Sequence, residues 1–153
     1  MLLAPLITLA SPGHARAIAG MSREYIEYGL GWSWTQARVL KAIQDSETNV
    51  AVAPAADDLM GFGIMRYGEH KAHLVLLGVH PDHRKRGLGG LLLAWLEASA
   101  VTAGLERVQL EARVDNPEAI AFYRRHGYSL NGVVPGYYRG QVDAVRLAKP
   151  LRP

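Results

Sequence analysis

Two hydrophobic periodicities alternate along this chain, and together they predict a mixed α/β fold. Apolar residues spaced by three and four indicate helices that bury one face, whereas short alternating or continuous apolar runs between turn residues indicate strands. The predicted strands are residues 6–9, 49–53, 60–67, 73–79, 108–114, 128–134 and 142–148. The predicted helices run from about residues 12 to 28, 35 to 44, 88 to 103 and 117 to 126. The order β-α-α-β-β-β-α-β-α-β-β predicts one sheet covered by helices.

Local signals fix several of these boundaries. Ser11, Thr35 and Asn116 each offer a side-chain oxygen where a helix begins, and Pro follows both Ser11 and Asn116. Leucines and a tryptophan repeat along residues 88–96, which predicts a strongly amphipathic helix. Residues 108–114 alternate between apolar and polar. Gln109, Glu111 and Arg113 are therefore expected on one face of that strand.

Composition narrows the class of protein. The 153 residues are 49% hydrophobic and 20% charged, which predicts one globular domain over residues 1–153. The 17 Lys and Arg against 14 Asp and Glu leave a net charge of +3, too small to indicate a nucleic-acid binder. The absence of cysteine excludes disulfides and cysteine nucleophiles, and a cytoplasmic location is the default expectation. The apolar N-terminal stretch of about ten residues is too short to span a membrane.

The sharpest chemical signal is a glycine-rich loop between a strand and a helix. Gly87, Gly89 and Gly90 stand where the helix begins, directly after Arg84-Lys85-Arg86. Glycine permits close approach to the backbone, and a helix N-terminus offers free N–H donors and a partial positive charge, so the loop predicts a phosphate or pyrophosphate site. The pattern is neither a Walker loop nor a Rossmann fingerprint. The alternative is a plain glycine turn with a solvated basic face.

At this point the sequence resembles the GNAT superfamily of N-acetyltransferases. The segment Arg84-Lys-Arg-Gly-Leu-Gly89 matches the family's Arg/Gln-x-x-Gly-x-Gly/Ala motif, and residues 116–128, Asn-Pro-Glu-Ala-Ile-Ala-Phe-Tyr-Arg-Arg-His-Gly-Tyr, look like its second signature. The resemblance covers nearly the whole chain. It implies a single-domain GNAT-like fold, in which a mixed, mostly antiparallel sheet with a splayed central strand pair is flanked by about four helices. Residues 110–116 and the late tyrosine pair look like the ribosomal-protein-alanine N-acetyltransferase branch.

The resemblance implies acetyl-CoA as the co-substrate. Backbone N–H groups from Arg86 to Gly90 would hold the pyrophosphate, and the strand end at Leu77-Gly78-Val79 would pair with the pantetheine arm. Asn116 would contact the pantetheine amides while also capping its helix. The implied cofactor-binding set is Leu77, Gly78, Val79, Arg84, Lys85, Arg86, Gly87, Leu88, Gly89, Gly90, Asn116 and Tyr123.

Two residues are implied for catalysis. Tyr123 matches the family tyrosine that protonates the departing CoA sulfur, and its alternative role is that of a core tyrosine. Glu111 is the candidate general base, acting directly or through water, and its alternative role is an ion pair with Arg113. The implied reaction is direct attack of a neutral amine on the thioester in a ternary complex, with no metal required.

The acceptor pocket is expected between the first two helices and the late tyrosines. Tyr28, Trp32 and Trp34 would form one wall, Tyr137 and Tyr138 the other, and Glu111 would lie beside the substrate. Alternatively, the two tryptophans plug the core. One glutamate and no pocket lysine favours an α-amine, whose ordinary pKa near ~8 is lower than that of lysine.

The acceptor is therefore expected to be a peptide N-terminus or a small molecule such as an amino acid, polyamine or drug. The competing classes are a non-catalytic CoA-binding module and a nucleic-acid binder that uses Arg84-Lys85-Arg86. Neither a nucleic-acid nor a membrane partner is expected. A homodimer is common in the family.

Overall fold

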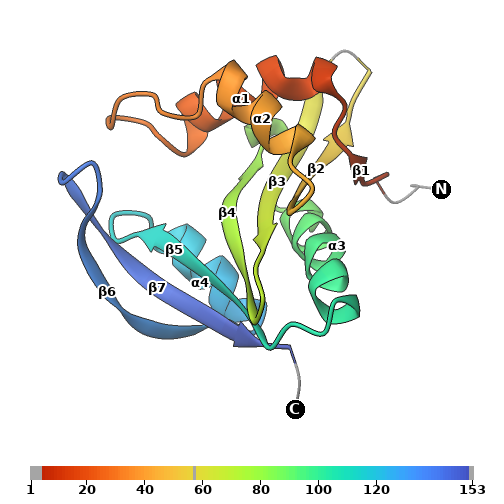
Figure 1. Cartoon of the computed structure of the whole chain (residues 1–153). Coiled ribbons are helices and arrows are strands. Elements are labelled where there is room, and N and C mark those ends of the chain that lie inside the picture. Colours follow the sequence, from red (N-terminus) through yellow and green to blue (C-terminus); the bar gives the residue numbers. More distant parts are fainter. Residues whose placement is uncertain (1–4, 57, 152–153) are drawn as a thin grey trace.

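The computed structural model describes residues 5–56 and 58–151, which fold around one seven-stranded sheet in the order β1-β2-β3-β4-β5-β7-β6 (Figure 1). The strands are β1 (Thr8–Leu9), β2 (Thr48–Pro54), β3 (Leu59–Tyr67), β4 (Lys71–Val79), β5 (Arg107–Arg113), β6 (Ser129–Tyr138) and β7 (Val142–Pro150). The helices are α1 (Ala15–Tyr25), α2 (Gln36–Gln44), α3 (Leu88–Thr102) and α4 (Pro117–Arg125), and residues 12–14 and 81–83 form short 3-10 turns. The predicted mixed α/β fold with four helices is confirmed.

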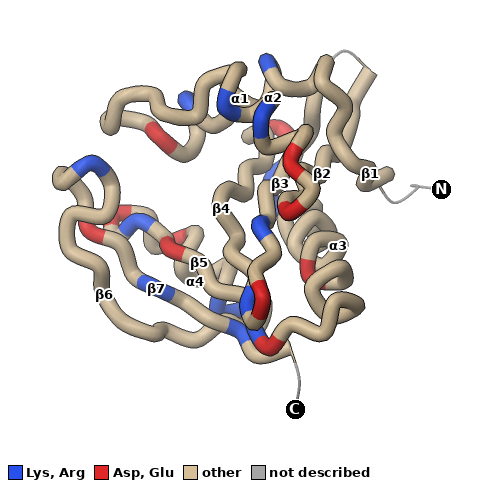
Figure 2. The backbone as a smooth tube through the Cα atoms, in the orientation of Figure 1, with Lys and Arg blue, Asp and Glu red and all other residues tan. Residues whose placement is uncertain are grey.

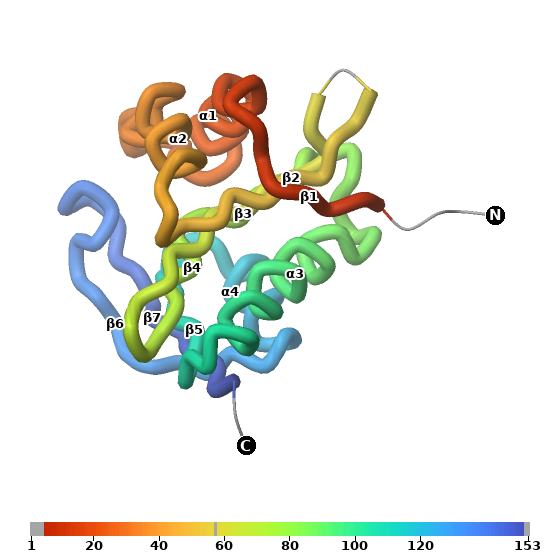
Figure 3. The backbone as a smooth tube through the Cα atoms, turned by 45° about the vertical axis from the view of Figure 1, so that its right-hand side comes forward, coloured from red at the N-terminus to blue at the C-terminus, as the bar shows by residue number. Residues whose placement is uncertain are grey.

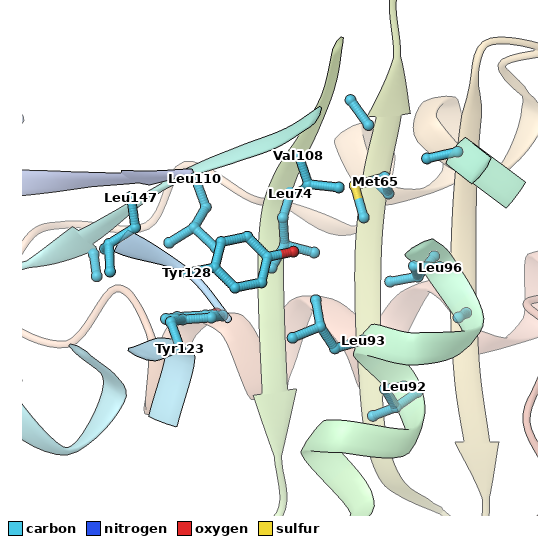
Figure 4. Close-up of a cluster of buried hydrophobic side chains, with 14 of the residues drawn as sticks. Met65, Leu74, Leu92, Leu93, Leu96, Val108, Leu110, Tyr123, Tyr128 and Leu147 are labelled. Carbon is cyan, nitrogen blue, oxygen red and sulfur yellow. The ribbon is translucent and has the colours of Figure 1, made fainter. Parts of the chain in front are cut away.

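Helices cover both faces of the sheet, α1 and α2 on one side and α3 and α4 on the other, and the core is divided in two (Figure 3). One cluster lies between the sheet and the α3–α4 side, and includes the residues that Figure 4 labels. The other lies beneath α1 and α2, around Ile18, Val39 and Phe62. In the first cluster, Tyr123 and Tyr128 stand among leucines from α3, β4, β5 and β7 (Figure 4). Burial of apolar surface on both faces holds the strands in fixed register.

The sheet splits between β4 and β5. These strands are parallel neighbours, but they pair only from Lys71↔Arg107 to Leu74↔Leu110. Beyond Leu74, β4 continues to pair with β3, while β5 continues to pair with β7. Figure 1 shows the resulting V, with one wing made of β1–β4 and the other of β5, β7 and β6. The splay places a cleft at the centre of the sheet.

Two predicted boundaries near the start of the chain are wrong, namely the beginning of the first strand and the end of the first helix. The first strand is Thr8–Leu9 rather than 6–9. The register that pairs Thr8 with Val52 would place residue 6 opposite Pro54, which has no backbone N–H to donate to a neighbouring strand. The first helix ends at Tyr25, so Tyr28 lies in the following loop. The predicted turn at residues 55–58 includes position 57, which lies outside the described residues.

The prediction that residues 88–103 form a strongly amphipathic helix is also wrong in one respect. The helix forms, but apolar residues continue around it, and Leu91 and Val101 remain 41% and 55% exposed. Leu92 and Leu96 are fully buried against the sheet, so the inner face still anchors the helix. No helix within residues 5–56 and 58–151 is long and apolar enough to cross a membrane.

Candidate active site

A cleft of about 880 Å³ occupies the gap between β4 and β5. Its walls come from the end of β4, the start of α3, the middle of β5, α4 and the β6–β7 hairpin. The cleft brings together most of the predicted site residues. These are Leu77, Gly78, Val79, Arg84, Lys85, Gly87, Leu88, Gly89, Gly90, Asn116, Tyr123, Glu111, Tyr28, Tyr137 and Tyr138.

One end of the cleft has free N–H donors at the start of a helix, as the predicted anion site requires. Gly87 is the N-cap of α3 with a φ of 80°, and Lys85 has a φ of 62°, so the loop turns sharply into the helix. The first N–H groups of α3, from Leu88 to Gly90, have no partner within the helix, because hydrogen bonding begins with the Leu91 N–H to the Gly87 carbonyl. These donors and the partial positive charge of the helix N-terminus suit a diphosphate.

The basic residues of this loop differ in position. The Nε of Arg84 donates to the carbonyl of Val79 at 3.0 Å, and its guanidinium lies over the ring of Tyr25. Arg84 and Lys85 line the cleft, whereas Arg86 is exposed and is not part of the wall. The side chain of Arg86 therefore does not line the predicted anion site.

The absence of a side chain at Gly90 allows α3 to pack closely against the end of α4. A Cβ at this position would lie 2.7 Å from the Nε2 of His126. The ring of His126 is held by a 2.8 Å hydrogen bond from its Nδ1 to the Phe122 carbonyl, so it cannot move away freely. The close packing of α3 and α4 at the mouth of the anion site therefore depends on glycine.

We expect Gly90→Ala to weaken CoA binding about tenfold, because α3 and α4 must separate at the end where the free N–H groups lie. Gly20→Ala is the matched control, since a Cβ in α1 meets nothing within 4 Å. The control should retain CoA affinity and gain up to about 1 kcal/mol of stability. Calorimetric titration with CoA and thermal unfolding test both variants. Equal CoA affinity of Gly90→Ala and the parent would contradict the prediction.

The β4 side of the cleft offers free backbone groups. From Leu77 to Val79, β4 pairs with β3 on one side, and no described strand pairs with it on the other. Asn116 lies across the cleft as the N-cap of α4, and its Oδ1 accepts from the Ala119 N–H at 3.2 Å. Its amide group remains available as a donor. An extended, amide-bearing ligand fits such an edge.

Tyr123 reaches the cleft from α4 out of a largely apolar environment. Its residue is 9% exposed, and its ring contacts Phe122 and Tyr128 edge to face. Burial raises the pKa of Tyr123, which keeps the phenol protonated at neutral pH. Within the part of the chain that the structure describes, no group hydrogen-bonds its hydroxyl. The side chain thus belongs to the core, as the alternative prediction has it, and also lines the cleft.

Glu111 is buried, with a side chain only 4% exposed, and four side chains surround it. Its Oε1 accepts hydrogen bonds from His73 Nε2 at 2.6 Å and from the Tyr137 hydroxyl at 3.1 Å. Its Oε2 accepts from Arg146 Nε at 3.0 Å and, at the longer distance of 3.5 Å, from Gln109. The alternative of an ion pair between Glu111 and Arg113 is wrong, because Arg113 donates to both carboxylate oxygens of Asp115 instead.

These contacts fix the charge of Glu111. Burial alone raises the pKa of a carboxyl, but the hydrogen bonds from His73 and Arg146 outweigh it and lower the pKa of Glu111 to about 2. The group is therefore ionised at neutral pH, which makes it a strong charge partner for a cation and a weak base.

Ionised Glu111 should stabilise the fold at neutral pH. Because its pKa is lowered from 4.5 to about 2, this contribution is complete above about pH 5 and is lost as the pH falls toward 2. We expect the stability difference between the parent and Glu111→Gln to be largest at pH 7 and to shrink steadily below pH 4.5. Urea unfolding from pH 7 to pH 3 measures it, with exposed Glu47→Gln as the control. A difference that stays constant with pH would contradict the prediction.

The late tyrosines close the β6–β7 side of the cleft. The Tyr138 hydroxyl donates to the Glu111 backbone carbonyl at 3.2 Å, and its ring stands edge to face with that of Tyr137. Burial and the neighbouring Glu111 raise the pKa of Tyr137 to about 12, so its hydroxyl remains a donor to the carboxylate. Both tyrosines lie where the sequence analysis expected the second acceptor wall.

Arg113 connects β5 to the loop that carries Tyr28, which is part of the predicted first acceptor wall. Its Nε and Nη2 donate to the two carboxylate oxygens of Asp115 at 2.9 Å, and its Nη1 donates to the carbonyls of Ile26 and Tyr28. The guanidinium also lies 3.9 Å from the ring centroid of Tyr28. This buried arginine therefore fixes the loop after α1 beside the cleft, a role that the sequence analysis did not anticipate.

The expectation that Trp32 and Trp34 form the acceptor wall is not met. Trp34 is 7% exposed and belongs to the core beneath α1 and α2. Trp32 donates from its Nε1 to the Ala19 carbonyl, and neither residue lines the cleft. The loop adopts this course because the Glu27 carboxylate accepts from Ser33 and from the Trp34 backbone N–H, which turns Trp34 inward, whereas Trp32 remains 40% exposed. The alternative of a core role is the one that the structure supports for Trp34.

The sequence analysis also missed His73 and Arg146. Both come from strands that flank β5, since β4 brings His73 beside Gln109 and β7 pairs Arg146 with Glu111. Each is a polar residue flanked by apolar neighbours in its strand, which was a visible signal. The register that directs both toward Glu111 was not visible. No group of acidic or histidine residues within the described ranges could hold a metal ion.

Comparisons with known proteins agree with this geometry. Residues 18–128 match the model of the acetyltransferase (GNAT) family. Over 100 residues, the chain is 36% identical to the [ribosomal protein bS18]-alanine N-acetyltransferase of Salmonella typhimurium, covering 63% of this chain and 68% of the relative. Ard1 from Thermoplasma volcanium superposes with a TM-score of 0.85 at 23% identity, covering 99% of this chain and 100% of that one.

A structure of aminoglycoside 6'-N-acetyltransferase complexed with coenzyme A has the same fold, with a TM-score of 0.79 at 21% identity, covering 97% of this chain and 98% of that one. The extent of the family match places this chain in the GNAT family. It is an acetyl-CoA-dependent N-acetyltransferase, and its relatives include the ribosomal-protein-alanine enzymes that residues 110–116 resemble.

Proposed function

We propose that this enzyme acetylates the N-terminal α-amine of a peptide or protein in a ternary complex with acetyl-CoA. The observation that carries the proposal is the position of Glu111. Its ionised carboxylate lies in the wall of the central cleft, opposite the β4 edge, and also lines a second, open cleft. An acceptor that presents a cationic amine to Glu111 can therefore continue outward as a chain.

The chemistry of the amine supports an α-amine. Bound acetyl-CoA supplies the thioester, whose C–S bond breaks as the amine nitrogen forms its bond to the carbonyl carbon. Direct proton transfer from an α-ammonium, with an ordinary pKa near ~8, to a carboxyl with a pKa of about 2 would cost about 8 kcal/mol. Glu111 therefore orients the amine and stabilises the positive charge that develops on the nitrogen. An α-amine suits this arrangement, because much of it is neutral without help at pH 7 to 8.

The reaction also moves two protons, one away from the amine nitrogen and one onto the departing sulfur. The proton that leaves the nitrogen passes to solvent water, because the second cleft opens beside Glu111, and Glu111 stays ionised throughout. Tyr123 gives its proton to the departing sulfur and regains one from solvent. Glu111 from β5 and Tyr123 from α4 thus have separate roles in the cleft, and we assign CoA to the end formed by α3 and β4.

Mass spectrometry after incubation with acetyl-CoA tests the proposal. The substrates are a peptide with a free α-amine and a lysine, the same peptide with a blocked α-amine, and a panel of amino acids, polyamines and aminoglycosides. We expect acetylation of the α-amine, with at least tenfold lower turnover of the blocked peptide. Preferred turnover of a small amine would favour the alternative of a small-molecule acetyltransferase. CoA binding without turnover of any amine would favour a non-catalytic CoA-binding module.

A further inference from the structure

A second cleft of about 560 Å³ adjoins the central one, a volume within the usual range for ligand sites. It lies where β3, β4, β5 and β7 converge, on the side of Glu111 toward Lys71 and Arg107. Glu111 and Tyr137 line both clefts, and a hydrogen bond of 3.1 Å joins them. An acceptor with its amine at Glu111 therefore passes directly into this second cleft.

The register of the strands arranges basic residues in rows across its floor. Arg66 pairs with His73, and His73 pairs with Gln109, so these three share one row. Lys71 pairs with Arg107 in the next row, two residues farther from Glu111 on both strands. Side chains two residues apart on a strand point to the same face, so both rows face the same side as Glu111. Figure 2 shows several Lys and Arg positions, with Asp and Glu positions among them, where these strands converge.

More basic than acidic side chains line the second cleft. Four Lys or Arg line it, against Glu69 and Glu111. Glu111 is already paired with Arg146 and His73. Arg66 and Lys71 are exposed, and neither forms an ion pair within residues 5–56 and 58–151. Asp45 interacts electrostatically with Arg66 but does not line the cleft. These two cations therefore remain available to an anionic ligand.

Dimensions relate the rows to positions of an acceptor chain. A strand rises about 3.3 Å per residue, so the row of Arg66 lies ~7 Å from the level of Glu111 and the row of Lys71 lies ~13 Å from it. An extended peptide covers these distances in about two and four residues. Side chains at about positions three to five would then meet Arg66 and Lys71.

We propose that the second cleft recognises carboxylate side chains of the acceptor, so that the enzyme prefers N-termini followed by Asp or Glu at about positions three to five. This inference rests on the proposed α-amine acetylation. Carboxylates are the peptide groups that Arg and Lys bind through charge-assisted hydrogen bonds. Partly exposed pairs of this kind contribute specificity and an association rate that falls with salt.

Three peptides test the inference. They share the same first two residues and a free α-amine, and carry Glu, Gln or Lys at positions three to five. With the parent enzyme, we expect the KM of the Glu peptide to be at least tenfold lower than that of the Gln peptide and the KM of the Lys peptide to be higher still. The KM of the Glu peptide should also rise between 50 and 500 mM salt.

The double variant Arg66→Glu/Lys71→Glu should abolish or reverse this preference while turning over the Gln peptide at the parental kcat. Lys41→Glu, an exposed charge reversal on α2, is the matched control and should keep the parental preference. Equal KM values for the Glu and Gln peptides with the parent enzyme, or an unchanged preference in the double variant, would overturn this inference alone. Failure of all three peptides to be acetylated at the α-amine would overturn it together with the proposed function.

Discussion

Glu111→Gln is expected to lower kcat by at least 100-fold while leaving the affinity for CoA within about twofold of the parent. The substitution keeps the shape of the side chain but removes the negative charge that we propose to face the amine. Electrostatic stabilisation of this kind contributes about 10²- to 10³-fold. The anion site at the start of α3 is a separate part of the cleft, so CoA binding should not change.

Steady-state kinetics with an α-amine peptide and calorimetric titration with CoA measure the two quantities. Glu97→Gln is a suitable control, because Glu97 is another largely buried glutamate, but it binds Tyr128 and Lys149 away from the cleft. It should lose stability and retain kcat. A kcat for Glu111→Gln within fivefold of the parent would mean that the carboxylate is not part of the reaction.

Tyr123→Phe is expected to lower kcat by about 100-fold, again with CoA binding retained. The ring would keep its packing against Phe122 and Tyr128, and only the hydroxyl that can protonate the sulfur would be lost. Because burial raises the pKa of Tyr123, the alkaline limb of the parent's kcat profile should not begin below about pH 10.

The neighbouring tyrosine provides the matched control. Tyr128 has a ring centroid 5.8 Å from that of Tyr123, but its hydroxyl donates to Glu97 at 2.6 Å and does not line the cleft. Tyr128→Phe should therefore lose stability, of the order of 1 kcal/mol, and keep its kcat. Equal losses of kcat in the two Phe variants would indicate a packing role for Tyr123 and remove it as the acid.

Local signals in the sequence were sufficient for much of the fold. Thr35 and Asn116 cap their helices as predicted, because a side-chain oxygen bonds a backbone N–H three residues ahead. The glycine loop was equally readable, since Gly87 and the free N–H groups after it are consecutive in the chain. The alternation in β5 correctly directed Glu111 and Gln109 to one face.

Side-chain partners across strands were not readable in this way. The environment of Glu111 depends on β4 and β7 flanking β5, and the sequence separations of 38 and 35 residues to His73 and Arg146 carry no local signal. The inward turn of Trp34 depends on a hydrogen bond from its backbone N–H to the Glu27 carboxylate, a contact that no pattern in the sequence indicated. The second cleft likewise appears only when the rows of three strands are aligned.

The central claim is that the amine attacks acetyl-CoA directly, with both substrates held together in the splayed cleft. Initial rates measured over a matrix of acetyl-CoA and α-amine peptide concentrations test it most directly. The account predicts intersecting lines in double-reciprocal plots, which indicate a ternary complex. Parallel lines, which indicate an acetylated enzyme intermediate, would contradict it.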